Sequence, residues 1–189
     1  MRKYLIFLFV LPVLITNCAG NKTPSKTDLV LGLQKMSDLA TAEYVVTKLI
    51  KANDDKTWYK AGDRKILMSC KASLVAGIDF SKITENDINV DGKNISITIP
   101  HAKLIYVDIK PEDVKTVYQE VSLFRNNFSS EEKNNLAKQA ERQITASADS
   151  LGILVTAESN ASIFINNFLR KQGFENISIS SGSPKQTLQ

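Results

Sequence analysis

The chain has 189 residues, of which 43% are hydrophobic and 23% are charged, and its formal net charge is +4. These fractions are ordinary for a globular protein. The positive charge includes Arg2 and Lys3 and is otherwise spread along the chain, so composition gives poor support for a nucleic-acid partner, and we expect none.

The first 17 residues have the pattern of a secretory signal peptide. A short positive start, Met1-Arg2-Lys3, precedes an uninterrupted apolar run at residues 4–15. About twelve residues of helix span roughly 18 Å, whereas a bilayer core is about 30 Å thick, so the run is too short to remain in a membrane as a span. We therefore predict that residues 1–17 are removed on export.

The signal ends in Ile15-Thr16-Asn17-Cys18, which resembles a bacterial lipoprotein box. The resemblance implies that the Cys18 thiol receives a diacylglycerol group, that cleavage occurs just before it, and that the new N-terminus is acylated. Several acyl chains hold a protein firmly at a membrane. Asn17 departs from the smaller residue usual at its position. The other interpretation is an ordinary cleaved signal followed by an unmodified cysteine.

We divide the remaining chain into three parts. A lipid-anchored flexible tether covers residues 18–28, a single domain covers residues 29–180, and a polar tail covers residues 181–189. With Cys18 lipidated, Cys70 has no disulfide partner. Because Cys70 lies within an apolar run, we interpret it as a small buried residue rather than a reactive thiol.

The first half of the domain is predicted to be mainly β-structure, after one short helix at residues 29–41. β-branched and aromatic residues favour strands at residues 42–52, 65–76 and 102–109, with a further short strand at Trp58-Tyr59. Asp91-Gly92 lies between alternating apolar residues, which predicts a hairpin at residues 87–99.

After Pro111 the apolar spacing becomes that of helices. Residues 113–121 fit a short helix, while residues 121–124 also suit an extended segment. Ser129 or Ser130 begins an amphipathic helix that continues to Gly152, and the helical pattern resumes over residues 154–172. Alternating residues at 174–180 then predict a final strand.

This order of elements predicts an α+β domain. We expect an antiparallel or mixed sheet of about five to six strands, with two main C-terminal helices packed on one face and a final short strand.

The stretch at residues 62–67, leading through Ala76-Gly77-Ile78-Asp79 to Ile99-Pro100, resembles the uncharacterised domain-of-unknown-function family 4230. The likeness covers residues 39–179. It implies a single exported domain close to a membrane, and it supplies neither an activity nor catalytic residues. The departure lies at the anchor, because the lipid-box Cys18 replaces the N-terminal membrane segment that members carry.

Candidates for catalytic chemistry are few. His101 is the single histidine, and its place after Pro100 at a strand boundary suits a structural residue. His101 and Cys70 are too few ligands for a zinc site. The chain has no phosphate-binding loop and no nucleophile motif, so we expect no enzyme, no metal and no cofactor.

The sequence Gly62-Asp63-Arg64-Lys65 allows two interpretations. Turn amides beside two cations could form a small anion site or partner contact at Arg64 and Lys65. The plainer interpretation is a hairpin turn with a local Asp–Arg pair, which we favour.

We expect a non-enzymatic lipoprotein of the bacterial cell envelope that acts by interaction. Lipid on Cys18 would hold it at a membrane with its domain facing the periplasm. The helix pair at residues 130–172 would meet a protein partner or another copy, because its small residues permit close approach. These are Ala137, Ala140, Ala146, Ala148, Ala157 and Ala161. The same residues could instead pack against the sheet.

Two alternatives stay open. The domain could bind a small apolar or anionic ligand between its helices and its sheet, because both layers are rich in Ile, Leu, Val and Phe. A hydrolase is the third interpretation.

Overall fold

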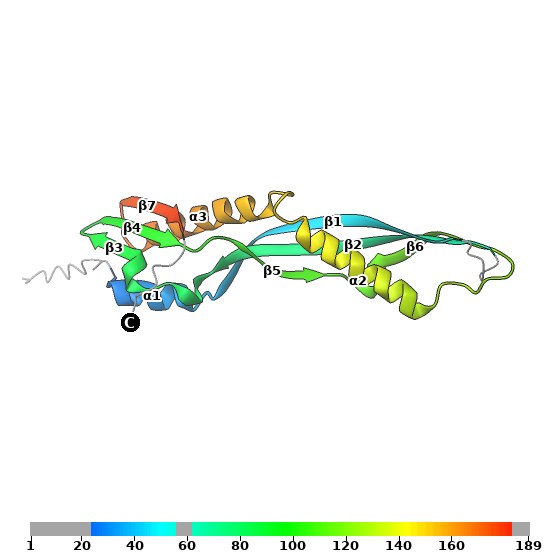
Figure 1. Cartoon of the computed structure of the whole chain (residues 1–189). Helices are drawn as coiled ribbons and strands as arrows, with labels where there is room; N and C mark the ends of the chain where they lie inside the picture. Colours follow the sequence, from blue (N-terminus) through cyan, green and yellow to red (C-terminus); the bar gives the residue numbers. More distant parts are fainter. Residues whose placement is uncertain (1–23, 56–61, 183–189) are drawn as a thin grey trace, which may run out of the picture.

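The computed structural model describes residues 24–55 and 62–182 and shows an elongated α+β molecule (Figure 1). The expected signal peptide at residues 1–17, the expected lipidation site Cys18 and the expected short strand at Trp58-Tyr59 lie outside these residues. The helices are α1 (Lys26–Gln34), α2 (Ser130–Ala146) and α3 (Ile153–Lys171). The strands are β1 (Asp38–Asp54), β2 (Arg64–Asp79), β3 (Ile88–Asp91), β4 (Asn94–Ile99), β5 (Lys103–Asp108), β6 (Val114–Val121) and β7 (Asn176–Ser181).

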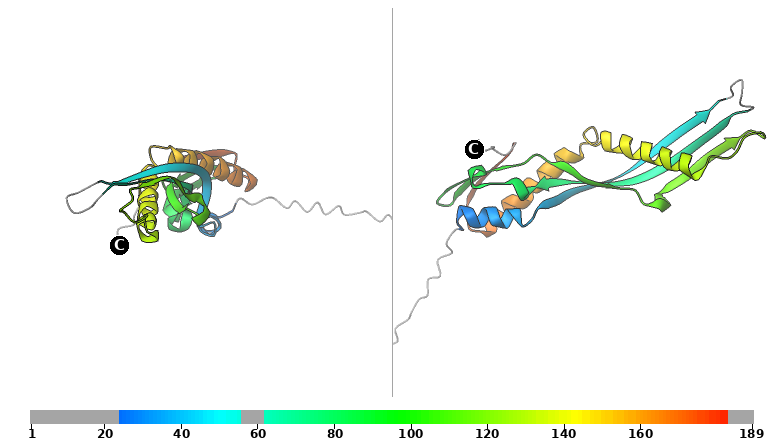
Figure 2. Two further views of the ribbon diagram at one scale, coloured as in Figure 1. Left: turned by 90° about the vertical axis from the view of Figure 1, so that its right-hand side faces the viewer. Right: turned by 60° about the horizontal axis from the view of Figure 1, so that its bottom comes forward.

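Two long strands form the axis of the molecule. β1 and β2 pair antiparallel from Asp38 opposite Asp79 to Asp54 opposite Arg64. At about 3.3 Å per residue this ribbon is about 50 Å long, and it projects beyond the helices (Figure 2). A Cβ on Gly77 would lie 1.9 Å from a backbone oxygen of β1, so only glycine fits where the two strands crowd.

β2 lies at the centre of a four-stranded sheet. β1 pairs with one side of it, and β5 and β6 pair with successive parts of the other side. Helices α2 and α3 follow one face of this sheet (Figure 1). Alternate side chains of β2 face the helices and are buried, namely Ile66, Met68, Cys70, Ala72, Leu74, Ala76 and Ile78. The opposite face of the sheet, which we call the open face, carries no helix of the described chain.

A second sheet of three strands closes one end of the molecule in the order β3-β4-β7. β4 and β7 both begin with Asn-Ile-Ser-Ile. They pair in parallel and in register, so that Asn94 lies opposite Asn176 and Ile97 opposite Ile179. Because side chains alternate along a strand, the isoleucines of both repeats join the core while the Asn and Ser residues face outward.

The core is unevenly divided along this axis. In what we call the basal part, α1, α3 and the three-stranded sheet pack with the adjoining half of the hairpin into one large apolar cluster. In the distal part, α2 and β6 cover the other half of the hairpin with two small clusters, one around Ile50 and Cys70 and one around Ile66, Met68 and Phe128. None of the helices in the described chain is long and apolar enough to span a membrane.

The expected fold class is confirmed, including the two C-terminal helices and the final short strand. The hairpin at residues 87–99 is also present, with Gly92 in the left-handed region at φ 56°. The strands number seven among the described residues and form two sheets rather than one. The first helix begins at Lys26 and ends at Gln34, so residues 38–41 belong to β1.

The helix expected at residues 113–121 is wrong. Pro111–Asp113 forms only a short 3-10 turn, and residues 114–121 form β6. Valine and threonine favour strands, and pairing of this segment with β2 satisfies its backbone groups across a long sequence distance. Long-range pairing therefore decided a segment whose local pattern was ambiguous.

Candidate functional site

The chain between β6 and α2 makes a tight turn at the end of the molecule where the long hairpin ends (Figure 1). The Arg125 amide donates to the Ser122 carbonyl at 2.9 Å, which makes Leu123 and Phe124 the central residues of a four-residue turn. Their exposed fractions are 98% and 84%. Such positions usually carry Gly, Pro, Asn, Asp or Ser. Two large apolar side chains are thus displayed where folding alone favours polar residues.

The Leu123–Phe124 turn is held against the loop that joins β1 to β2. The Ser122 amide donates to the Asp63 carbonyl at 3.1 Å, and the Asp63 amide donates to Ser122 Oγ at 3.0 Å. Arg125 Nη1 donates to the Gly62 carbonyl at 3.2 Å. Gly62 has φ 93°, and a Cβ there would lie 2.4 Å from the Ser122 Cβ. These contacts fix both sides of the apolar pair.

An ionic cluster lies behind the turn. Arg64 Nη2 contacts Asp54 Oδ2 at 2.8 Å and Glu132 Oε1 at 2.7 Å, and Arg125 Nη2 contacts the same Asp54 oxygen. The two arginine side chains are only 12% and 11% exposed. The Arg64 guanidinium carbon also lies 4.5 Å from the centre of the buried Phe128 ring. The cluster joins both long strands to the turn and to the start of α2.

The charges of this cluster stabilise one another. Hydrogen bonds from Arg64 and from the Ser129 amide lower the pKa of Glu132. Hydrogen bonds to Glu132 and Asp54 raise the pKa of Arg64. Arg64 and Glu132 are therefore both ionised at neutral pH. Ser129 and Glu132 also form a capping box at the start of α2, so the same carboxylate serves the helix and the cluster.

The structure places the two predicted contact residues differently. Arg64 points into the ionic cluster, where carboxylates of this chain occupy its guanidinium. Lys65 is exposed on the open face. The favoured interpretation was a local Asp–Arg pair within residues 62–65, whereas the ion pair in the structure joins Arg64 to Asp54 across the hairpin.

The other residues considered for chemistry have structural surroundings. The His101 ring is exposed and its Nδ1 lies 3.0 Å from Glu158 Oε1. Cys70 is fully buried, and burial raises the pKa of its thiol. Within the described residues no group of three or more His, Cys, Asp or Glu side chains could hold a metal ion. Cys18 lies outside the described residues.

The small residues of the helix pair serve the core. Ala140, Ala148, Ala157 and Ala161 are at most 3% exposed and pack in the apolar clusters under the helices. Ala137 is partly buried beside Ile50, and Ala146 is exposed. Four of the six alanines thus pack against the sheet, which was the alternative to a role in contacts with a partner.

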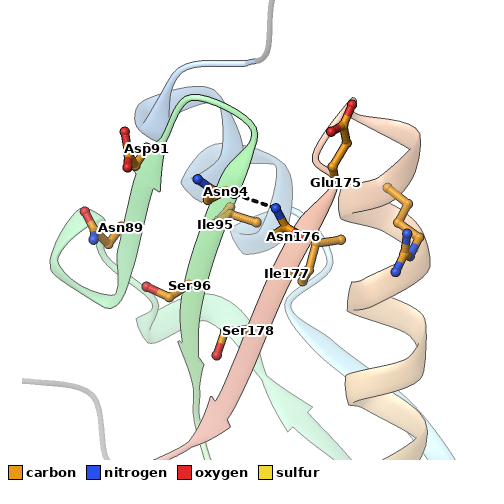
Figure 3. Close-up of a pocket in the computed structure, with 10 residues that line it drawn as sticks. Asn89, Asp91, Asn94, Ile95, Ser96, Glu175, Asn176, Ile177 and Ser178 are labelled. Carbon is orange, nitrogen blue, oxygen red and sulfur yellow. Dashed lines mark hydrogen bonds between the residues drawn. The ribbon is translucent and has the colours of Figure 1, made fainter.

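A second feature is the polar outer face of the three-stranded sheet, drawn in Figure 3. Asn94, Ser96, Asn176 and Ser178 project from the paired repeats of β4 and β7 (Figure 3). Asn176 Nδ2 donates to Asn94 Oδ1 at 2.8 Å. An open hollow of about 680 Å³ lies over this face. It is on the outside of the sheet, not between the helices and the sheet where a ligand was expected.

Sequence reasoning treated residues 121–124 as a possible extended segment and missed the apolar turn. The available signal was a Leu-Phe pair between Ser122 and Arg125-Asn126-Asn127, shortly before a helix cap at Ser129. Apolar residues in such a polar linker do not follow the period of either flanking element. Only the folded chain shows that this linker is a tight turn on which both side chains are largely exposed.

A family model described as "Protein of unknown function (DUF4230)" matches residues 32–179. No curated protein and no solved structure matches the chain. The matched range runs from within α1 into β7, so it contains both sheets, the ionic cluster and the Leu123–Phe124 turn.

Proposed function

The chain belongs to the DUF4230 family of proteins of unknown function, and we propose that it is a membrane-tethered interaction domain of the bacterial cell envelope that binds a protein partner through the Leu123–Phe124 turn. The observation that carries this proposal is the nearly complete exposure of two large apolar side chains on a hydrogen-bonded turn. The domain would act by binding, without catalysis of its own.

The exposure of Leu123 and Phe124 leaves the free energy of burying their side chains unused. Full burial of a leucine or phenylalanine side chain is worth about 1.5–3 kcal/mol. Leu123 and Phe124 gain almost none of this in the isolated chain, because they are 98% and 84% exposed. Sequences that break a local rule without a gain in stability tend to do so at functional sites. A partner that buries both side chains would recover this energy.

The shape of the site indicates the form of the partner. The turn joins β6 to α2 at the distal end of the molecule (Figure 2) and its two apolar side chains are exposed, so the partner must supply the recess. The polar bonds around Ser122 and Arg125 hold the turn in place before binding. Little conformational entropy would then be lost on association, which favours binding by a small surface.

The tether is the second part of the proposal. A lipid on Cys18 would connect the membrane to α1 through a short segment. Helix α1 lies in the basal part, at the opposite end of the hairpin from the turn (Figure 1). The Cys18→Ala variant should leave the membrane fraction, whereas the Cys70→Ala variant should stay there. Equal retention of both variants would contradict a lipid anchor.

Photo-crosslinking tests the partner contact directly. Phe124 is replaced by a benzophenone analogue of phenylalanine in the full chain, in the bacterium that makes it. The matched control carries the same group at Val155, which is 74% exposed on α3. We expect a discrete protein adduct from position 124 alone, reduced about tenfold by Leu123→Ser, because loss of one buried leucine costs more than about 1.4 kcal/mol.

The same adduct must then form between the two purified proteins. The proposal fails if position 124 gives no protein adduct, gives only lipid adducts, or crosslinks no better than position 155.

The hollow over the polar face of the small sheet supports a second candidate, a ligand-binding module. Its Asn and Ser side chains suit a polar ligand rather than the apolar or anionic one expected from sequence. Native mass spectrometry of the purified protein tests this candidate. A bound small mass that is lost on Asn94→Ala would support it, and a bare protein would count against it.

A further inference from the structure

β1 is an edge strand of unusual length. It has 17 residues, and among the described strands it pairs only with β2. At its basal end the Thr41 carbonyl accepts a hydrogen bond from Asn160 Nδ2 on α3. Its one irregularity also lies there, between Ala40 and Ala42. Residues 42–54 therefore form a regular strand along the border of the sheet.

This edge lacks several of the devices by which proteins block edge pairing. Such devices include proline, bulges, short length and coverage by other elements. Residues 42–54 contain no proline. On the open face, Val45 and Leu49 are 62% and 58% exposed. A long regular edge with exposed aliphatic side chains is a template for another strand.

The side chains of β1 indicate which strand could pair with its free edge. Along the open face the order is Glu43, Val45, Thr47, Leu49 and Lys51. When a second copy of this strand runs in the opposite direction, its lysine lies opposite the glutamate of the first copy. The aliphatic residues lie opposite each other, and the two threonines meet at the centre. In antiparallel pairing, residues directly opposite each other interact. The open face of β1 is therefore complementary to itself.

We propose that β1 pairs antiparallel with β1 of a second copy of this chain, about a two-fold axis at Thr47. Glu43 of each copy then lies opposite Lys51 of the other, and Val45 lies opposite Leu49. A two-fold contact uses the same surface on both subunits, so each of these pairs occurs twice. The two four-stranded sheets become one continuous sheet.

Neighbouring registers are less favourable. A centre at Val46 places Glu43 opposite Leu49, which leaves a charge against an aliphatic side chain. A centre at Lys48 places two lysines directly opposite each other, and like charges in that position are destabilising. Registers that pair odd with even positions would turn the open face of one copy toward the helix face of the other. Charge pairing and apolar pairing together favour the register in which the two-fold axis passes through Thr47.

Pairing through β1 also determines how the two copies lie relative to each other. Because the strands are antiparallel, the two basal parts lie at opposite ends of the joined sheet, and both helix layers lie on one face. If each chain is tethered through its N-terminal segment, the pair would lie lengthwise along one membrane. The pairing itself does not depend on the tether or on the Leu123–Phe124 turn.

Disulfide trapping of the full chain in its native membrane tests the register. In the Thr47→Cys variant the two new cysteines would have Cα atoms about 5 Å apart, within the range of a disulfide. The control is Val45→Cys, because two Val45 residues would be about 13 Å apart along the strands, which is too far. The native Cys70 is buried and does not compete. We expect a disulfide-linked dimer from Thr47→Cys at least tenfold faster than from Val45→Cys.

Charge exchange provides an independent readout in the Thr47→Cys background. Glu43→Lys and Lys51→Glu, made singly, should each slow trapping about tenfold, because each creates two pairs of like charges. The double variant restores opposite charges across the contact and should return trapping to within about twofold of the parent. Equal trapping at positions 45 and 47 would overturn the proposal. The proposal would also be overturned if the single charge exchanges did not slow trapping at position 47, or if the double variant did not restore its rate.

Discussion

The basal and distal parts are held together by different forces. In the basal part a single apolar cluster includes the fully buried Leu74, Phe80 and Ile165. The distal part has only two small apolar clusters, and the ionic cluster around Arg64 joins its strands to α2. Burial of apolar area is the larger and less salt-sensitive force. The basal part therefore holds the fold, while the distal part depends on a few charged contacts.

This division suits the proposed function. Regions that bind partners are often drawn from the less stable parts of a protein. The distal part carries the Leu123–Phe124 turn, and Arg125 belongs both to the turn and to the ionic cluster. A change in the cluster would therefore reach the turn before it reached the basal core.

The largest effect is expected from a cavity in the basal cluster. Leu74→Ala should lower the free energy of unfolding by roughly 2–5 kcal/mol, because Leu74 is fully buried and its neighbours can close the space only in part. Chemical denaturation measures the loss, and hydrogen exchange should show faster opening in both parts of the molecule. Exchange that rises in the distal part alone would contradict the assignment of Leu74 to the basal cluster.

A smaller and more local effect is expected from Arg64→Met. The change removes the cation between Asp54 and Glu132, and hydrogen bonds to charged groups are worth about 1.5–3 kcal/mol. Amides of β6 and the distal half of β2 should exchange faster, with little change in the basal strands. Lys93→Met serves as the control, because its pair with Glu175 is more than 60% exposed on both sides and should contribute less than about 1 kcal/mol.

Acid should also weaken the basal part, through Asp79. Hydrogen bonds from Ser81 and Lys103 lower the pKa of Asp79 from 3.8 to about 2. A lowered folded pKa stabilises the protein above the unfolded value, and this stability is lost as the pH falls from about 4 to about 2. The loss should amount to about 1–2 kcal/mol.

Denaturation curves recorded across that pH range would measure the loss. The Asp79→Asn variant should lose this part of the slope. An unchanged slope would mean that the hydrogen bonds from Ser81 and Lys103 do not lower the pKa of Asp79 in solution.

The sequence predicted those elements whose pattern is local. The hairpin at Asp91-Gly92 and the helices on either side of Gly152 follow from turn chemistry and apolar period. β6 was mistaken for a helix because its pairing with β2 is a long-range contact. The division into two sheets could not be predicted from the sequence either, because β7 pairs with β4 across a separation of 82 residues. The side chain of Asn176 hydrogen-bonds to that of Asn94 across this pair.

The candidate site was less predictable than the fold. Asp54, Arg64 and Glu132 come from three separate segments, and only the folded chain shows that they meet. Arg64 was recognised as a residue of interest, but the sequence could not show that two carboxylates of the same chain surround it. The self-complementary order of β1 was present in the sequence, yet it gained meaning only once β1 was found to be an edge strand.

The smallest effect on stability is expected at the Leu123–Phe124 turn. Residues of an exposed binding site can be changed with little loss of stability, whereas buried core residues cannot. The double variant Leu123→Ser and Phe124→Ser should change the free energy of unfolding by less than about 0.5 kcal/mol, since exposed side chains contribute little to folding. Phe128→Ala, a few residues along the chain, should cost about 3 kcal/mol or more because that ring is buried under Arg64. Thermal or chemical unfolding of the two variants provides the comparison. If the double serine variant were strongly destabilised, the two side chains would be part of the fold, and their exposure would no longer support a role in binding.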